Sequence, residues 1–149
     1  MMRMRWLPAV LIFCCAWAGP LRADLKTALA ESNLGKRSKL ALDNAAVALK
    51  TAREAYGKGD NQAVAAAAGE ILQSVDFAYD SLIKTGKNPR SSPRWFKSAE
   101  ISTRDLSRKL DSFQRDMDFA DRPLLDKVKA RVQQVHDELL LGLMEGKRK

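Results

Sequence analysis

The sequence predicts an all-α protein: an antiparallel, up-down-up-down four-helix bundle that follows a cleaved N-terminal signal peptide. Three observations lead to this prediction. Four long segments carry apolar residues at alternating spacings of three and four, the pattern of helices that pack together. No segment alternates apolar and polar residues as a half-buried strand does. The connections between the segments are short to moderate, which favours antiparallel neighbours.

The first 23 residues have the layout of a secretory signal peptide. Arg3 and Arg5 precede an uncharged, mostly apolar run over residues 6–18. A membrane-spanning helix needs about 20 apolar residues, so this run is short for an anchor, and an uncleaved anchor is the alternative. We therefore expect an exported protein, periplasmic or secreted, with no transmembrane span in the mature chain.

Removal of this segment changes the chemistry of the chain. Cleavage is expected after Ala23 or after Ala18. Cleavage after Ala23 leaves 126 of the 149 residues, removes three arginines and lowers the formal net charge from +8 to +5. Both cysteines, Cys14 and Cys15, leave with it, so the mature chain has no disulfide and no thiol nucleophile. The remaining residues, 24–149, have the length of one domain.

The first two bundle helices are predicted over residues 34–57 and 61–85. Asn33 and Asp60 are their N-cap residues, because a short polar side chain there accepts from a free helical amide. The apolar stripes consist of Leu42, Ala45, Leu49, Ala52 and Tyr56, and of Val64, Ala68, Ile71, Val75, Ala78 and Leu82. The stretch AYGKGD at 55–60 resembles the inter-helix turn of tetratricopeptide repeats, but it does not recur at their period of about 34 residues. The resemblance implies one helical hairpin and no repeat array.

The last two helices are predicted over residues 93–117 and 122–145. Ser92 stands before a proline as an N-cap, and Asp121 is the corresponding start signal of the final helix. The stripes consist of Ala99, Thr103, Leu106, Leu110, Phe113 and Met117, and of Leu125, Val128, Val132, Val135 and Leu139. Both helices thus present one apolar face to a shared core.

Charged pairs are expected on the outer faces of the helices. Five acids stand four residues before a base: Glu54–Lys58, Asp80–Lys84, Glu100–Arg104, Asp105–Lys109 and Asp111–Arg115. Each such pair stabilises a solvated helix by about 0.2–0.5 kcal/mol. These pairs predict exposed helix faces and are assigned no function.

Catalysis is not predicted. His136 is the only histidine, and nucleophilic catalysis requires a nucleophile beside a base that a third group orients. Carboxylate-bridged metal bundles use Glu-x-x-His, but position 133 is Gln, and no Cys-x-x-Cys-His haem motif occurs. We therefore predict no catalytic residue, no metal ligand and no cofactor. The alternative is a cofactor-carrying bundle in which His136 binds a metal, or a haem together with Met117 or Met144.

Residues 84–97 are the most suggestive stretch for binding. No acidic residue lies between Asp80 and Glu100, whereas five bases and one tryptophan do. Bases beside an aromatic ring can contact an anionic surface. The candidate binding residues are Lys87, Arg90, Arg94, Trp95 and Lys97. The alternative is a solvated basic loop in which Trp95 or Phe96 closes the end of the bundle.

These observations predict an exported, non-catalytic protein with a binding or structural role in the cell envelope. The expected partner is a protein, a phospholipid or an acidic envelope polymer, and export disfavours nucleic acid. A monomer or a weak homo-oligomer is expected. A self-associating helical module is a further alternative, in which Leu72, Tyr79 and Leu140 cover a partner helix rather than widen the core.

Overall fold

The computed structural model describes residues 24–146. The predicted signal peptide at 1–23 and the last three residues, 147–149, lie outside the described residues. The elements are α1 (Lys26–Ala30), α2 (Leu34–Gly57), α3 (Asn61–Lys84), α4 (Arg94–Asp116), the 3₁₀ helix η1 (Arg122–Leu125) and α5 (Asp126–Glu145). The described part of the chain contains no strand, so the prediction of an all-α protein with four long helices is confirmed.

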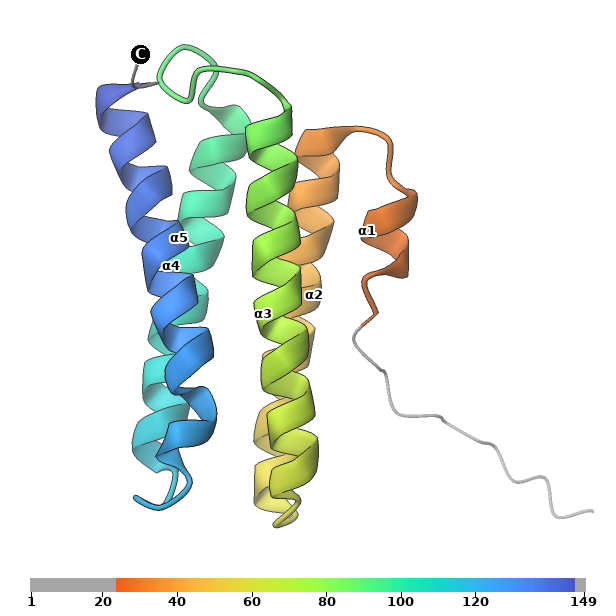
Figure 1. The fold of residues 1–149 in the computed structure, drawn as a ribbon, viewed down its shortest axis with the longest axis vertical. Coiled ribbons are helices and arrows are strands. Elements are labelled where there is room, and N and C mark those ends of the chain that lie inside the picture. Colours follow the sequence, from red (N-terminus) through yellow and green to blue (C-terminus); the bar gives the residue numbers. More distant parts are fainter. Residues whose placement is uncertain (1–23, 147–149) are drawn as a thin grey trace, which may run out of the picture.

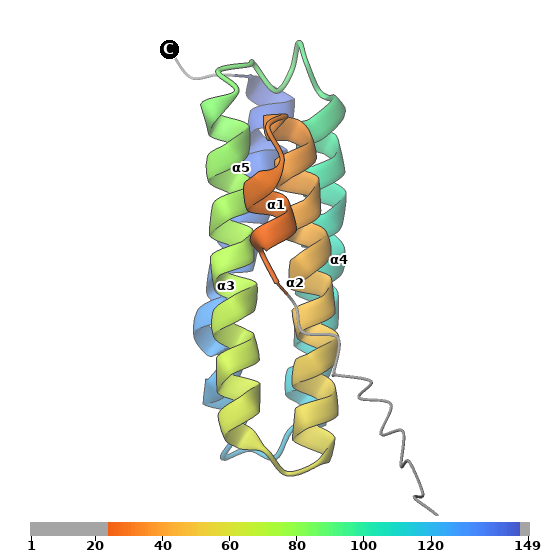
Figure 2. The same cartoon turned by 90° about the vertical axis from the view of Figure 1, so that its right-hand side faces the viewer.

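Four long helices lie side by side, and α1 rests on the outside of α2 and α3 (Figures 1 and 2). The α3–α4 connection and the end of α5 lie at one end of the molecule, which we call the loop end. The α2–α3 and α4–α5 connections lie at the opposite end, which we call the turn end. None of the helices between residues 24 and 146 has the length and apolar character that a membrane crossing requires.

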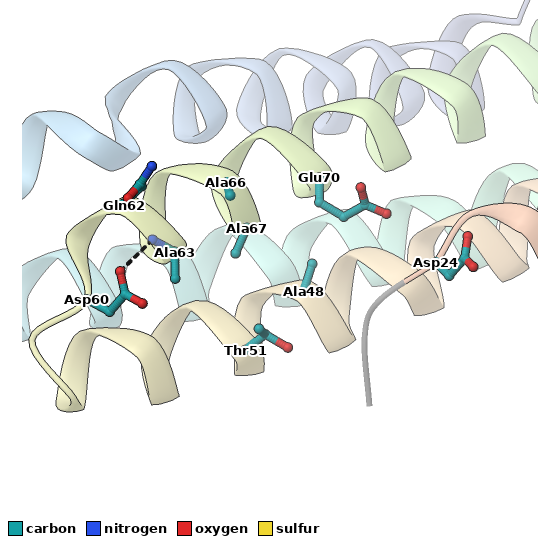
Figure 3. Close-up of a pocket in the computed structure, with 9 residues that line it drawn as sticks. All are labelled: Asp24, Ala48, Thr51, Asp60, Gln62, Ala63, Ala66, Ala67 and Glu70. Carbon is teal, nitrogen blue, oxygen red and sulfur yellow. Dashed lines mark hydrogen bonds between the residues drawn. The ribbon is translucent and has the colours of Figure 1, made fainter. Parts of the chain in front are cut away.

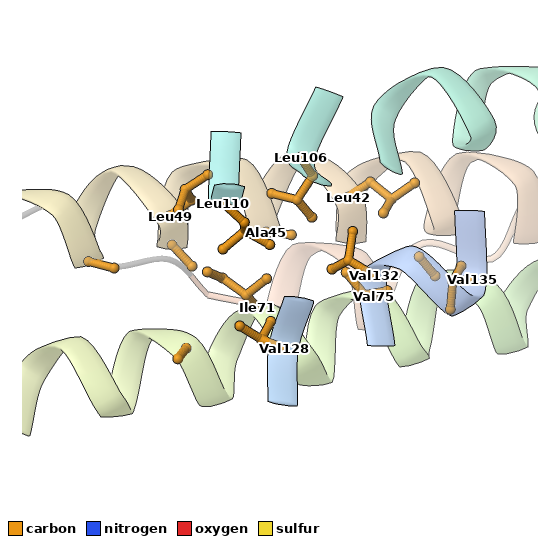
Figure 4. Packing of buried hydrophobic residues seen from close by; sticks show 14 of the residues in the cluster. Leu42, Ala45, Leu49, Ile71, Val75, Leu106, Leu110, Val128, Val132 and Val135 are labelled. Atoms are coloured by element: carbon orange, nitrogen blue, oxygen red, sulfur yellow. The ribbon is translucent and has the colours of Figure 1, made fainter. Parts of the chain in front are cut away.

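The predicted apolar stripes form the core (Figure 4). All the stripe residues predicted for α3, α4 and the η1–α5 segment are buried, as are those of α2 except Tyr56, which is partly buried. Leu72 and Tyr79 pack against this core and widen it, whereas Leu140 is 41% exposed. Burying one large apolar side chain stabilises the folded state by about 1.5–3 kcal/mol, so this core is the main source of stability.

The first two helix starts follow the sequence prediction, and the third does not. The Lys36 amide donates to the Asn33 side chain at 3.0 Å, and the Ala63 amide donates to Asp60 at 3.0 Å. Ser92 is not the N-cap of α4, because its amide donates to the Asn88 carbonyl at 2.9 Å and so belongs to the preceding loop. Pro93 occupies the N-cap position without a side-chain cap.

The predicted capping role of Asp121 is also wrong. A 3₁₀ helix, η1, intervenes before α5, and the Asp121 side chain makes no cap hydrogen bond. Its carboxylate instead accepts from the Tyr56 hydroxyl at 3.1 Å and from Asn61 Nδ2 at 2.9 Å. A carboxylate has several acceptor positions, and here donors from α2 and α3 occupy two of them. Asp121 therefore ties the α4–α5 connection to the α2–α3 turn.

The sequence leaves residues 24–32 open between an extra helical turn and a flexible lead. The structure places the five-residue helix α1 there, beside the α2–α3 hairpin, and Ala28 is only 2% exposed because α1 packs on α2. A buried polar contact joins α2 and α3: Asn44 Nδ2 donates to Ser74 Oγ and to Glu70 Oε1, each at 2.9 Å. The α2–α3 pair is thus held by the apolar core and by one polar bridge.

Candidate functional site

Four of the five predicted binding residues are exposed bases at the loop end. Lys87 and Arg90 lie in the α3–α4 connection, and Arg94 and Lys97 lie in the first turn of α4. None of the four forms an ion pair with another described residue. Their charge is therefore not neutralised locally and remains available to a partner.

Trp95 has a different environment from these bases. Its indole packs directly on Gly35 of α2, where a Cβ atom would lie 2.4 Å from the ring. The Arg94 guanidinium carbon lies 4.7 Å from the ring centroid, within the range of a cation–π contact. Phe96, the next residue, is 3% exposed and belongs to the core. The aromatic pair therefore joins α4 to its neighbours, and only part of Trp95 faces solvent.

The start of α2 brings a further base to this region. Lys36 follows Gly35, on which Trp95 packs, and it is exposed without an ion pair to the described residues. Sequence reasoning missed it because it lies some 50 positions before Lys87. The basic run Lys36-Arg37-Ser38-Lys39 is the sequence feature that could have indicated this base. Within it, Arg37 donates a hydrogen bond to the Glu31 carbonyl and Lys39 forms an ion pair with Asp43.

The α3–α4 connection is held against the end of α5. A Cβ atom at Gly142 would lie 3.2 Å from Pro89 Cγ, so the glycine permits this close approach. Gly146 has φ of 80°, a left-handed conformation suited to glycine, and it ends α5 beneath Asn88 and Arg90. The loop that carries Lys87 and Arg90 is therefore fixed in place rather than suspended in solvent.

A cavity of about 200 Å³ lies beneath this connection, between α3 and α5. Its walls include Tyr79, Phe96 and Leu139, and Lys87 and Glu138 also line it. Burial and a hydrogen bond to Glu138 raise the pKa of Tyr79 to about 12. Tyr79 is thus a neutral phenol at physiological pH and contributes packing and one hydrogen bond.

His136 lies between α5 and α4 rather than on an open surface. Its side chain is 13% exposed, and its Nδ1 atom is 3.7 Å from Oε1 of Glu100, which is itself buried. This nitrogen makes no hydrogen bond within the described chain. The sequence analysis missed Glu100 as a neighbour of His136, because packing brings it in from another helix.

The surroundings of His136 bear on the alternative of a cofactor-carrying bundle. No three His, Cys, Asp or Glu side chains among residues 24–146 are grouped so that they could hold a metal ion. Met117 directly follows the last residue of α4 and stands 17 positions beyond Glu100, about 25 Å along the helix axis at 1.5 Å per residue. A single iron therefore cannot be bound by both His136 and Met117 in this arrangement.

A groove of about 650 Å³ runs between α2 and α3 toward the turn end (Figure 3). Four alanines form much of its lining, together with Thr51 and Gln62. The charged residues that line it, Asp24, Asp60 and Glu70, are all acidic. Its charge is opposite to that of the loop end, so this groove does not suit an anionic partner.

The charged pairs predicted from the sequence are only partly formed. Arg104 lies 3.6 Å from Glu100, and Lys109 lies 2.7 Å from Asp105. Asp111 pairs with Lys129 of α5 at 2.7 Å instead of with Arg115. The pairs Glu54–Lys58 and Asp80–Lys84 are not within ion-pair distance. Helical spacing alone does not decide the partner, because acids at helix flanks also meet bases of the next helix.

Comparison with known proteins provides no relative to guide the assignment. No protein family model matches the chain, and no curated protein and no solved structure matches it either. The function must therefore be inferred from the charge, burial and geometry described above.

Proposed function

We propose that this chain is an exported, non-catalytic protein of the cell envelope that binds an anionic partner through the basic residues of the loop end. In this proposal it is an antiparallel, up-down-up-down four-helix bundle, periplasmic or secreted, that follows a cleaved signal peptide at 1–23. Connections at alternating ends of the molecule support the topology. The basic start and the short apolar run of the sequence support export.

The observation that carries the proposal is the set of exposed bases without ion-pair partners at the loop end. Lys87, Arg90, Arg94 and Lys97 are exposed together. The connection that carries Lys87 and Arg90 is packed on α5, and Arg94 and Lys97 lie in the first turn of α4. A fixed group of like charges raises the local concentration of oppositely charged partners. Outside the cytoplasm, such partners are phospholipid headgroups, acidic polymers and acidic proteins. We assign the binding to these four bases, with Trp95 as the structural contact that holds them.

The described side chains also support a non-catalytic role. The only histidine of the chain is 13% exposed and lies 3.7 Å from the buried Glu100, with little access for a substrate. A general base must come within hydrogen-bond reach of the proton that it removes. A binding or structural role needs no such access.

Co-sedimentation tests the proposed binding. The mature protein is purified from the envelope fraction and mixed with anionic phospholipid vesicles or an acidic polymer such as polyglutamate, at 20 mM and 500 mM salt. We expect binding at low salt that is largely lost at high salt, because the Debye length falls from about 20 Å to about 4 Å. The variant Arg90→Ala/Arg94→Ala should bind at least several-fold more weakly.

The control removes the same charge at the turn end. Lys58→Ala/Lys127→Ala changes two exposed bases that lie away from the loop end and form no ion pair with the described residues. This control should bind nearly as well as the unchanged protein. Binding that ignores salt, or equal losses in the two variants, would contradict the assignment to the loop end.

Export is tested separately by cell fractionation and by mass spectrometry of the N-terminus. We expect the protein in the envelope or the medium, beginning at Asp24 or Gly19. A cytoplasmic protein that retains Met1 would contradict the export part of the proposal.

A further inference from the structure

The exposed side of α4 is almost entirely basic. Eight residues of this helix are exposed: Arg94, Lys97, Ile101, Arg104, Arg108, Lys109, Arg115 and Asp116. Six of the eight are Lys or Arg, and one is acidic. Such a composition is not a general property of the described chain, in which exposed acids and bases are mixed on the other long helices.

Five of these bases lie in one row. We call these five bases the outer row: Arg94, Lys97, Arg104, Arg108 and Arg115. They follow one another at spacings of three, seven, four and seven positions. Residues at such spacings lie on one side of an α-helix. The row spans 21 positions, or about 32 Å at 1.5 Å per residue. It therefore extends from the loop end almost to the turn end.

The acids of α4 do not neutralise this row, because most of them contact neighbouring helices. Glu100 is buried beside His136, and Asp111 pairs with Lys129 of α5 at 2.7 Å. Asp116 pairs with Arg53 of α2 at 3.3 Å. The acids thus stabilise the contacts between helices and leave the outer row with a net positive charge.

Two members of the row retain a nearby acid. Arg104 lies 3.6 Å from the buried Glu100, and Arg108 lies 3.3 Å from Asp105. Asp105 is shared, since Lys109 also contacts it at 2.7 Å. The side chains of Arg104 and Arg108 are 55% and 75% exposed, so both can still reach a partner.

The shape of the row favours one kind of partner. Ile101 is the only apolar residue exposed on α4, because the other large apolar side chains of this helix lie in the core or against α2. A helix that inserts into a bilayer surface needs a broad apolar face directed toward the lipid, and the exposed side of α4 lacks one. A narrow row of charges about 5 to 10 Å apart along the axis suits a polymer that repeats its anionic groups.

We propose that the outer row binds a linear polyanion, a polymer with repeating phosphate or carboxylate groups, laid lengthwise along α4 from the loop end. This inference rests on the proposed anionic partner and names its class and path. Four of the five bases are arginines, whose planar guanidinium groups bind phosphate or carboxylate oxygens in pairs. The loop-end bases contact one end of the polymer, and Arg108 and Arg115 contact a later part.

Affinity measurements with polyphosphate of defined chain lengths test this path. The mature protein is titrated with triphosphate and with chains long enough to span about 30 Å, at several salt concentrations. We expect the longer chains to bind at least tenfold more tightly per chain than triphosphate. The double variant Arg108→Gln/Arg115→Gln should weaken binding of long chains and reduce the slope of log K against log salt by about 1–2.

The matched control is Lys58→Gln/Lys127→Gln, which removes two exposed bases near the same end of the molecule but away from the outer row. The control should change affinity and slope much less than the row variant. Thermal unfolding of each variant verifies that the fold is retained. Equal effects of the two variants, or no dependence on chain length, would overturn the inference.

Two further outcomes separate this inference from the proposed function. If Arg90→Ala/Arg94→Ala abolishes binding but Arg108→Gln/Arg115→Gln does not, the loop end binds the anion and the outer row does not. If anionic vesicles bind and polyphosphate does not, the partner is a membrane and the polymer inference is wrong. Loss of all salt-sensitive binding would contradict both proposals.

Discussion

The glycine at position 35 allows Trp95 to pack on α2 at the loop end. The indole occupies the space where any other residue at position 35 would place its Cβ, 2.4 Å from the ring. In the proposed mature chain Trp95 is the only tryptophan, because the other two, Trp6 and Trp17, lie in the predicted signal peptide. Its fluorescence therefore reports on this contact without interference.

We predict that Gly35→Ala displaces Trp95 and destabilises the mature protein by about 1–3 kcal/mol, because overpacking outweighs the gain of about 0.5–1 kcal/mol from removing a helical glycine. Tryptophan emission should move to longer wavelength. Gly69→Ala in α3 is the control, since a Cβ there meets no atom within 4 Å and should stabilise the helix. Urea unfolding and emission spectra measure both effects. A stabilising Gly35→Ala with unchanged emission would contradict this packing.

We predict that Tyr79 makes the free energy of unfolding depend on pH in the alkaline range. Burial and the hydrogen bond to Glu138 raise its pKa to about 12, above the ordinary value of 10. The native state therefore holds the phenolic proton more tightly than the unfolded state does. This contribution is fully present below pH 10 and is lost as the pH rises toward 12.

After a discount for partial exposure, we expect a loss of about 1–2 kcal/mol. Tyr79→Phe lacks this titration, so the advantage of the natural protein over the variant should shrink between pH 9 and pH 11.5. Urea unfolding of both proteins at the two pH values measures the change. If the difference in unfolding free energy between the two proteins is the same at both pH values, the pKa of Tyr79 is not raised by its surroundings.

At the scale of helices, the α2–α3 pair depends on a buried polar bridge. Asn44 is 9% exposed and Ser74 is fully buried, and the Asn44 amide donates to the Ser74 hydroxyl. We predict that Asn44→Ala costs about 1–3 kcal/mol, because it leaves a buried hydroxyl without this partner. Asn44→Leu/Ser74→Ala should recover much of the loss, since both polar groups are then absent. Thermal unfolding of the two variants checks this, and equal losses would contradict the bridge.

The helices themselves could be predicted from the sequence because their apolar spacing is a local property. Residues such as Ile71, Leu110 and Val132 are buried as the stripes predict. The misassigned starts have a different origin: Ser92 bonds within its own loop, and Asp121 is claimed by donors from α2 and α3. Such competition between partners depends on tertiary contacts, which spacing along one helix does not contain.

The candidate site could be predicted only in part, because only some of its residues are close together in the sequence. The bases of residues 84–97 are contiguous in sequence, so their shared location followed from composition. The packing of Trp95 on Gly35, the arrival of Lys36, and the burial of Glu100 against His136 all join distant segments. The outer row of α4 was not predicted, because helical spacing assigned Arg104 to Glu100 and Arg115 to Asp111, whereas Asp111 pairs with Lys129 of α5 in the structure.

At the scale of the whole molecule, charge is divided between surfaces. The loop end and the outer row of α4 are basic, whereas the groove between α2 and α3 is lined by Asp24, Asp60 and Glu70. A polyanion should therefore approach one side of the molecule and avoid the other. Surface charges separated by more than about 8 Å are largely screened at physiological salt, so only bases that touch the polymer contribute strongly.

The central claim is that the loop end and the outer row of α4 bind a polyanion. The most direct test is to record backbone amide NMR spectra of the mature protein during titration with long-chain polyphosphate at low salt. We predict that signals of residues 84–97 and of the exposed positions of α4 shift progressively, while those of Ala48, Ala63 and Ala66 in the α2–α3 groove stay unchanged. The shifts should reverse when salt is added. Shifts centred on the groove, or no reversible shift at any residue, would contradict the claim.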